Sequence, residues 1–264
     1  MDNFNFAAID IKEHRLEGAE QPVIVATLNR PEVRNAIDET MVAELHELCS
    51  YLERAPHILI LTGCQVETPK GTRGIFASGA DISQLRERRR EDALRGINST
   101  IFHRVAALPA PVIAAIDGYA LGGGLELALA ADFRLATPFA KFGQPEAGLG
   151  IIAAAGALWR LKEAVGTPLA KEILLAGRVL NGKEALEAHL VNEIHEPASL
   201  EEAALALAGK ISKLDPLAVR LSKQLISLPA EAHPAIDNIA QAVTFESPAK
   251  FDRMQAFLDR KANK

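Results

Sequence analysis

The sequence predicts an α/β fold, and three observations support that prediction. Short apolar runs rich in β-branched residues at 22–28, 57–62 and 111–116 have the length and composition of buried strands. Segments with helical spacing of apolar residues separate these runs, and strands that alternate with helices favour a sheet covered by helices. Beyond about residue 155 the pattern is mostly helical, without a Pro/Gly/Ser-rich linker, a fixed-period repeat or a low-complexity segment.

The first predicted strand and helix follow each other closely. PVIVATL (22–28) runs into the turn-forming stretch Asn29-Arg30-Pro31. Asp38 is a candidate N-cap for the helix that follows, and HILILT (57–62) is expected to be the next buried strand. The helix carries one apolar stripe, formed by Met41, Leu45, Leu48 and Leu52.

Between the strands at 57–62 and 111–116, we expect a loop and then one helix. The segment CQVETPKGTRGIFASGADI (64–82) has the glycine and polar content of a surface connection with a functional role. Residues 83–107 are expected to form a helix with a charged first half. Its second half carries an apolar stripe of Ile97, Ile101, Val105 and Leu108.

After the strand PVIAAI (111–116), a glycine-rich turn and a helix over 125–131 are expected. The helices that follow include one with an apolar face over 200–211, and the strand-like LVNEIH (190–195) interrupts them.

The composition argues against several classes of partner. Twenty-nine Lys and Arg residues stand against 34 Asp and Glu, and the formal net charge of −5 gives no general attraction for nucleic acid or an anionic membrane. The N-terminal stretch has no basic segment followed by a long apolar run, and Cys49 and Cys64 form no CxxC pair. We therefore expect a cytoplasmic protein in a reducing compartment, without nucleic-acid or membrane partners.

The stretch GYALGGGLELALAADF (118–133) places three consecutive glycines before a strong helix-forming run. A helix N-terminus has unpaired N–H groups and partial positive charge, and glycines let an anion come close. FASGADI (76–82) has similar character, with Asp81 placed to cap a helix. Together the two segments would complete an oxyanion hole. Each alone is also compatible with packing or simple turn chemistry, and neither GxGxxG nor GxxxxGK[ST] occurs here.

Two glutamates add to this pattern. Glu126 lies in the apolar helix LELALAA, and Glu146 follows Pro145 in the glycine-rich KFGQPEAGLG. Burial would raise the pKa of each carboxyl toward a range suited to proton transfer, and two such acids can divide acid and base roles. The alternative is one exposed glutamate and one loop glutamate without a catalytic role.

Several motifs, in order along the chain, resemble those of the crotonase family, and most closely its enoyl-CoA hydratases. This resemblance implies a crotonase-like spiral of ββα units over residues 1–195, which holds an acyl-CoA site, and a C-terminal helical region over 196–264 that forms trimers or dimers of trimers. The motifs are LNRPEVRNAI (28–37), ILTG (60–63), FASGADI (76–82), PVIAAIDGYALGGGLELALAADF (111–133), KFGQPEAGLG (141–150) and FESPAKFDRMQAFLDRKAN (245–263).

By the same resemblance, the main-chain N–H groups of Ala80 and Gly123 would bind the thioester oxygen and stabilise the enolate. Glu126 would orient and deprotonate the water that attacks the β-carbon of a trans-2-enoyl-CoA, and Glu146 would deliver the α-proton. The product would be a 3-hydroxyacyl-CoA. Neither a metal nor a separate cofactor is implied, since coenzyme A is part of the substrate, and the histidines form no HExxH motif.

The coenzyme A portion would lie along the first loop and the FASGADI segment. The arginine-rich run RERRR (86–90) is either a further contact to it or a solvated helix face. The positions that match the family's places around pantetheine, nucleotide and thioester are Arg34, Ala36, Ser78, Asp81, Ile82 and Gly122.

One departure from the family pattern bears on the substrate. Where relatives have a turn close to PGAGGTQRL, this chain has AAAGALWRL (153–161), and His189 stands where a glycine is common. By the resemblance, this turn helps to shape the acyl pocket, so we expect the change to alter acyl preference and water placement. An enoyl-CoA isomerase, another acyl-CoA lyase of the family and, less favoured, a non-catalytic or RNA-binding member are the alternatives to a hydratase.

Overall fold

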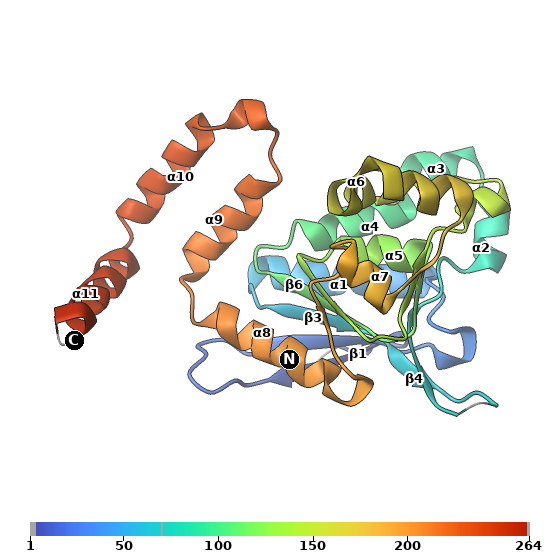
Figure 1. The fold of residues 1–264 in the computed structure, drawn as a ribbon, viewed down its shortest axis with the longest axis horizontal. Helices are drawn as coiled ribbons and strands as arrows, with labels where there is room; N and C mark the ends of the chain where they lie inside the picture. Colours follow the sequence, from blue (N-terminus) through green and yellow to red (C-terminus); the bar gives the residue numbers. More distant parts are fainter. Residues whose placement is uncertain (1–3, 70, 263–264) are drawn as a thin grey trace.

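A computed structural model describes residues 4–69 and 71–262 of the chain. The first three residues of the N-terminal segment and residue 263 of the family-like segment 245–263 lie outside the described residues. Two β-sheets form the body, and most helices cover them (Figure 1). The six-stranded sheet has the order β1 (Ile9–His14), β2 (Val23–Leu28), β3 (Leu59–Thr62), β6 (Val112–Ile116), β8 (Phe133–Ala136), β11 (Glu193–Ile194). The five-stranded sheet has the order β10 (Leu180–Asn181), β9 (Lys141–Gly143), β7 (Tyr119–Leu121), β5 (Arg73–Ala77), β4 (Cys64–Val66).

The chain alternates between the two sheets as it advances. Strand β6 lies in the first sheet, β7 in the second, and helix α5 (Gly123–Leu129) follows. The next unit repeats this order with β8, β9 and helix α6 (Ala157–Ala176). This succession confirms the predicted crotonase-like spiral of ββα units.

The six-stranded sheet separates two apolar clusters, because successive side chains of a strand point to opposite faces. On β2, Val23 and Val25 join one cluster, whereas Ile24 and Ala26 join the other. The larger cluster takes in helices α1 (Glu39–Arg54) and α4 (Ile97–Ala106) and most of α5. The smaller cluster is closed by α8 (Leu200–Ser212), so both faces of the sheet are buried.

The N-terminal predictions are confirmed. Asp38 caps α1, since its carboxylate accepts from the N–H of Met41 at 2.9 Å. All four residues of the predicted stripe on that helix are buried. The predicted strands at 22–28, 57–62 and 111–116 correspond to β2, β3 and β6.

The prediction of a loop over 64–82 is wrong in part. Strands β4 and β5 pair as an antiparallel hairpin within this segment, and Ile75, Phe76 and Ala77 are buried. The polar and glycine residues of the segment lie mainly between the two strands. The buried apolar run of β5 is only a few residues long, so it does not stand out in the composition of the whole segment. The glycine-rich turn predicted after 116 likewise contains the short strand β7.

The prediction of one continuous helix over 83–107 is also wrong. The segment forms α2 (Ile82–Glu87), α3 (Arg90–Arg95) and α4. Arg88 and Arg89 adopt extended backbone conformations between the first two helices, and Gly96 (φ 63°) is left-handed before the third. A left-handed residue ends a helix at little cost when it is glycine.

The C-terminal helices differ in how they meet the body. Helix α8 packs on the six-stranded sheet, whereas the helices after it extend away as an arm (Figure 1). The division of the chain at residue 196 stays a prediction. No helix among residues 4–69 and 71–262 is long and apolar enough to cross a membrane. The remaining elements are η1 (Pro31–Val33), η2 (Glu146–Leu149), α7 (Gly182–Glu187), η3 (Pro197–Ser199), α9 (Pro216–Ile226), η4 (Ala230–Ala232), α10 (Ala235–Phe245) and α11 (Pro248–Ala262).

Candidate active site

Each of the three consecutive glycines lies where a side chain would meet a neighbour. Gly122 has φ 51°, and a Cβ there would come within 2.7 Å of the Glu146 Oε1 atom. A Cβ at Gly124 would overlap the carbonyl group of Ala77 in β5. A Cβ at Gly123 would lie 3.4 Å from the main-chain nitrogen of Ala80. The glycines therefore let the start of α5 lie directly against β5 and the segment after it.

The main-chain N–H group of Ala80 points away from Ile37, the residue with which Ala80 forms an isolated β-bridge. Ile37 donates to the carbonyl of Gly79 at 2.8 Å and accepts from the N–H of Asp81 at 2.9 Å. This pairing uses the groups on either side of Ala80 and leaves its own N–H on the opposite side. The N–H of Gly123 is in the first turn of α5, where helix geometry provides no partner. Within residues 4–69 and 71–262, neither N–H donates to a protein acceptor.

Glu126 is held inside the protein by the turn that departs from the family pattern. Its side chain is buried, and Oε1 accepts from the N–H groups of Ala155 at 2.7 Å and Ala157 at 3.1 Å. Burial raises the pKa of Glu126, and these two donors oppose the rise because they favour the charged form. Since backbone groups make both bonds, the altered side chains of this turn leave the support of Glu126 in place.

Glu146 begins η2 and is less deeply buried. Burial raises its pKa to about 7, and the nearby charge of Glu126 adds to the rise. Gln144 is buried and contacts Glu146. When the Gln144 amide is oriented so that both its oxygen and its nitrogen have suitable partners, the nitrogen donates to Glu146 Oε2 at 2.8 Å and to Oε1 at 3.2 Å. The sequence prediction that burial raises the pKa of both acids is confirmed in direction.

The structure brings the two predicted acids and the two predicted N–H donors together. Gly122 lies between the acids and the donors, because it directly precedes Gly123 and a Cβ added to it would contact Glu146. The carboxylates and the N–H pair thus lie around one point at the start of α5. This arrangement can bind a developing negative charge and move protons beside it.

The residues predicted to contact coenzyme A form one continuous edge beside this point. The Arg34 carbonyl accepts from the N–H of Ser78 at 3.1 Å, and the side chain of Arg34 is exposed. Asp81 caps α2 by accepting from the N–H groups of Ser83 and Gln84, and the hydrogen bond from the Ser83 hydroxyl, together with these donors, lowers its pKa. Ala36 is half-buried, and Ile82 is 59% exposed.

Sequence reasoning missed a buried asparagine that joins this edge to β5. Asn35 is fully buried, and its amide nitrogen donates to the carbonyl groups of Leu28, Ile75 and Phe76. The one signal in the sequence is the residue type, since asparagine tolerates the left-handed region, which Asn35 adopts here (φ 54°), better than most residues. Gln144 was missed as well, because its spacing of two residues from Glu146 resembles ordinary loop sequence.

Two other observations concern positions outside the site. His189, at the position where the family resemblance leads us to expect glycine, has a left-handed backbone (φ 59°) and is exposed. No group of three or more His, Cys, Asp or Glu residues in the described part of the chain could hold a metal ion. That the reaction needs neither a metal nor a cofactor stays a prediction.

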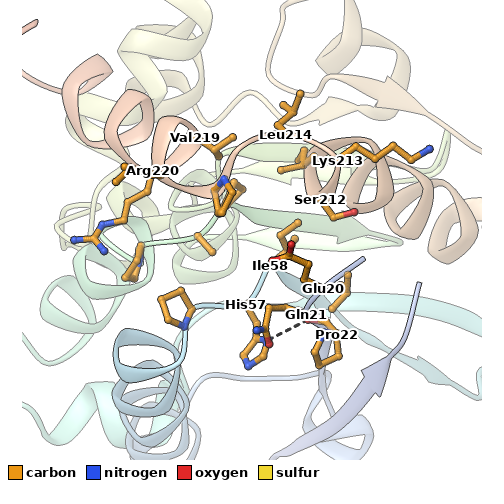
Figure 2. Close-up of a pocket in the computed structure, with 18 of the residues that line it drawn as sticks. Glu20, Gln21, Pro22, His57, Ile58, Ser212, Lys213, Leu214, Val219 and Arg220 are labelled. Atoms are coloured by element: carbon orange, nitrogen blue, oxygen red, sulfur yellow. Dashed lines mark hydrogen bonds between the residues drawn. The ribbon is translucent and has the colours of Figure 1, made fainter. Parts of the chain in front are cut away.

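A cavity of about 570 Å³ lies between the body and the start of the C-terminal arm. Figure 2 shows His57 and Pro22 on one side of it and Lys213, Val219 and Arg220 on the other. His57 Nδ1 lies 3.1 Å from the Pro22 carbonyl oxygen. None of the ten predicted site residues lines this cavity, so it is separate from the acid pair.

Comparison with known proteins identifies the family of this chain. The family model described as enoyl-CoA hydratase/isomerase matches residues 18–263. A short-chain-enoyl-CoA hydratase of Clostridium acetobutylicum is 36% identical over 255 residues, which cover 92% of this chain and 93% of that protein. A crotonyl-CoA hydratase of Syntrophomonas wolfei is 35% identical, with 92% and 95% covered. The crystal structure of enoyl-CoA hydratase from Bacillus anthracis has a TM-score of 0.85 and 31% identity, with 96% and 97% covered.

Proposed function

Since the chain belongs to the enoyl-CoA hydratase/isomerase family, we propose that it adds water to a trans-2-enoyl-CoA and forms a 3-hydroxyacyl-CoA. The observation that carries this proposal is the pair of shielded carboxylates, Glu126 and Glu146, beside two unpartnered main-chain N–H groups. Hydration needs this combination, because a proton must leave water and a proton must reach the α-carbon.

The N–H groups of Ala80 and Gly123 bind the thioester oxygen of the substrate. As the hydroxyl adds to the β-carbon, electrons of the double bond move toward this oxygen and form an enolate. The partial positive charge at the start of α5 favours that charge. Donors fixed by backbone geometry need no rearrangement when the charge develops, which lowers the barrier.

The surroundings of the two acids divide their roles. Two N–H donors on Glu126 favour its carboxylate form, which suits the base that takes a proton from water. Burial and the charge of Glu126 favour the protonated form of Glu146, which suits the donor to the α-carbon. Addition of both groups from one side of the double bond gives a syn product.

The edge formed by residues 34–36 and 78–82 holds the coenzyme A portion. Exposed Arg34 supplies a cation for a phosphate group, and exposed Ile82 supplies apolar surface for pantetheine. Gly122 leaves room for the thioester between this edge and Glu146.

The experiment is a spectrophotometric assay of crotonyl-CoA, whose conjugated double bond loses its absorbance on hydration. We expect turnover without added metal or cofactor. An isomerase that moves a double bond from position 3 to position 2 needs only one base. If a 3-enoyl-CoA is converted and crotonyl-CoA is not hydrated at high enzyme concentration, the hydratase assignment is wrong.

The arm also suggests an assembly. We propose a homo-oligomer, a trimer or a dimer of trimers, formed through the C-terminal helices, because large apolar side chains are exposed along them. On α11 the residues Phe251, Met254 and Leu258 follow helical spacing and are each more than half exposed. The cytoplasmic location and the absence of nucleic-acid and membrane partners stay predictions.

A further inference from the structure

Arg88 differs from the other arginines of the RERRR run. Three of them are exposed, as expected for a solvated surface: Arg86, Arg89 and Arg90. Arg88 lies where the chain bends between α2 and α3, and its residue is only partly exposed. Its Nη1 atom donates to the Oδ1 atom of Asn98 at 3.0 Å, and its Nε atom is buried without a partner.

The contact with Asn98 places this guanidinium group beside the oxyanion hole. Asn98 is in the first turn of α4, and because its Oδ1 atom faces an arginine, its amide nitrogen faces the other way. That nitrogen lies 3.8 Å from the Cβ position of Gly123, which is itself 3.4 Å from the nitrogen of Ala80. Arg88 is therefore one side chain away from the two N–H groups that bind the thioester oxygen.

Among the described residues, the positive charge of the Arg88 guanidinium group is not balanced by a nearby carboxylate. Within the described ranges, no carboxylate lies within ion-pair distance of it, and the nearby Glu87 instead approaches Arg86 at 3.9 Å. Leaving a buried donor without an acceptor is unfavourable, and more so when the donor is charged, so such groups are rare and call for an explanation. With Nη1 engaged by Asn98 and Nε buried, Nη2 is the guanidinium nitrogen left for a ligand, and a charge-assisted hydrogen bond from it fits a carboxylate oxygen.

We propose that Arg88 and Asn98 form a carboxylate-binding subsite of the acyl pocket, and that the preferred substrates are enoyl-CoA thioesters whose acyl chain ends in a carboxylate. The inference rests on the proposed function, since it assigns the substrate class of that site. Arg88 acts here as a specificity-determining residue: it holds the far end of the acyl chain and takes no part in proton transfer. Asn98 fixes the guanidinium group through its Oδ1 atom.

Binding is measured first, with ligands that cannot be hydrated. Saturated six-carbon acyl-CoA thioesters, one ending in a methyl group and one in a carboxylate, are titrated calorimetrically into the full-length protein and its Arg88→Met and Arg88→Lys variants. We expect the parent to bind the carboxylate-ended ligand more tightly. Arg88→Met should weaken that ligand alone by about 10- to 100-fold, and Arg88→Lys should restore part of the loss. Arg90→Met, in the exposed part of the same run, is the matched control and should change neither affinity.

The corresponding 2-enoyl-CoA pair then gives kcat/KM for hydration. Selectivity for the carboxylate-ended chain should fall by the same factor in Arg88→Met, with the methyl-ended chain unaffected. Equal affinities of the parent for both saturated ligands, or an equal loss for both in Arg88→Met, would overturn the inference, and the second result would assign Arg88 to coenzyme A or to folding. Hydration of neither 2-enoyl chain would refute the proposed function, whereas the calorimetric result would still decide the subsite.

Discussion

At the scale of single residues, Glu126 and Glu146 are two acids in different surroundings. Backbone N–H groups of Ala155 and Ala157 stabilise the charge on Glu126. Glu146 also contacts a donor, the Gln144 amide, but burial and the neighbouring Glu126 carboxylate raise its pKa to about 7. The sequence predicted both acids and the direction of their pKa shifts, since each glutamate stands among apolar residues. It did not predict Gln144, Asn98 or the inward turn of Arg88, because the direction of a polar side chain depends on tertiary neighbours.

Replacing Glu146 with glutamine should lower kcat/KM for crotonyl-CoA by at least about 100-fold, because the proton donor to the α-carbon is lost. The protein should remain folded, since the amide is close in shape to the carboxyl group. Steady-state kinetics and circular dichroism check these outcomes. Glu47→Gln on α1 is the control, because Glu47 is exposed; an equal loss in the control would remove the argument for Glu146.

The pKa of about 7 for Glu146 also predicts a pH profile. The acid role needs the protonated carboxyl group, so kcat/KM for hydration should fall as the pH rises through about 7. The measurement is kcat/KM from pH 5.5 to 9 at constant ionic strength. A rate that stays level up to pH 9 would contradict the assigned role of Glu146.

The same shift has a consequence for stability. The folded state keeps the Glu146 proton up to about pH 7, whereas the unfolded chain loses it near pH 4.5, so the free energy of unfolding decreases as the pH rises between these values. Glu146→Gln removes this ionisation and should raise the melting temperature at pH 8, with a smaller gain at pH 5. Calorimetric melting at the two pH values tests this; a gain of the same size at both would show that another interaction is responsible.

At the scale of elements, the close contact between α5 and β5 positions the oxyanion hole. The sequence predicted the strand-turn-helix order around the three glycines, because this order has strong local signals. It did not predict β4, β5 and β7, because these strands are short, and β5 and β7 pair with each other across more than one intervening helix. The break of the predicted helix at Arg88 was missed because arginine is a good helix former, and the break depends on where Arg88 finds space.

Gly124→Ala should separate α5 from β5, because the added Cβ would overlap the Ala77 carbonyl group. We expect a loss of about 1–3 kcal/mol in the free energy of unfolding and a fall in kcat of about 100-fold or more, since the Gly123 N–H moves with the helix. Denaturant unfolding and kinetics measure the two effects. Gly148→Ala is the control, because a Cβ there would have no neighbour within 4 Å. A Gly124→Ala variant as stable and active as this control would show that the contact is unimportant.

At the scale of the whole molecule, the body buries its apolar side chains, whereas the arm leaves many of them exposed. The body buries both faces of its larger sheet, and periodicity in the sequence made this core predictable. The arm exposes the apolar residues Phe251, Phe257 and Leu258. In a soluble protein, the apolar face of a helix normally packs against another part of the protein. The alternation of the chain between two sheets followed from family resemblance, because residue patterns do not specify which of two sheets receives a short strand.

Replacing Phe251 and Phe257 together with glutamate should shift the protein from the proposed trimer or hexamer toward the monomer. Burying charges in an apolar interface is costly, while the body does not rely on these exposed side chains. Sedimentation velocity of the parent and the variant checks the change. The proposed assembly is wrong if the parent itself sediments as a monomer across micromolar concentrations.

The central claim concerns one oxygen atom, and a crystal structure with a bound saturated acyl-CoA tests it most directly. We predict that the thioester oxygen lies about 2.7–3.1 Å from the main-chain nitrogens of both Ala80 and Gly123, with Glu126 and Glu146 beside the α- and β-carbons. A thioester oxygen directed away from these two nitrogens, with the coenzyme fully bound, would contradict it.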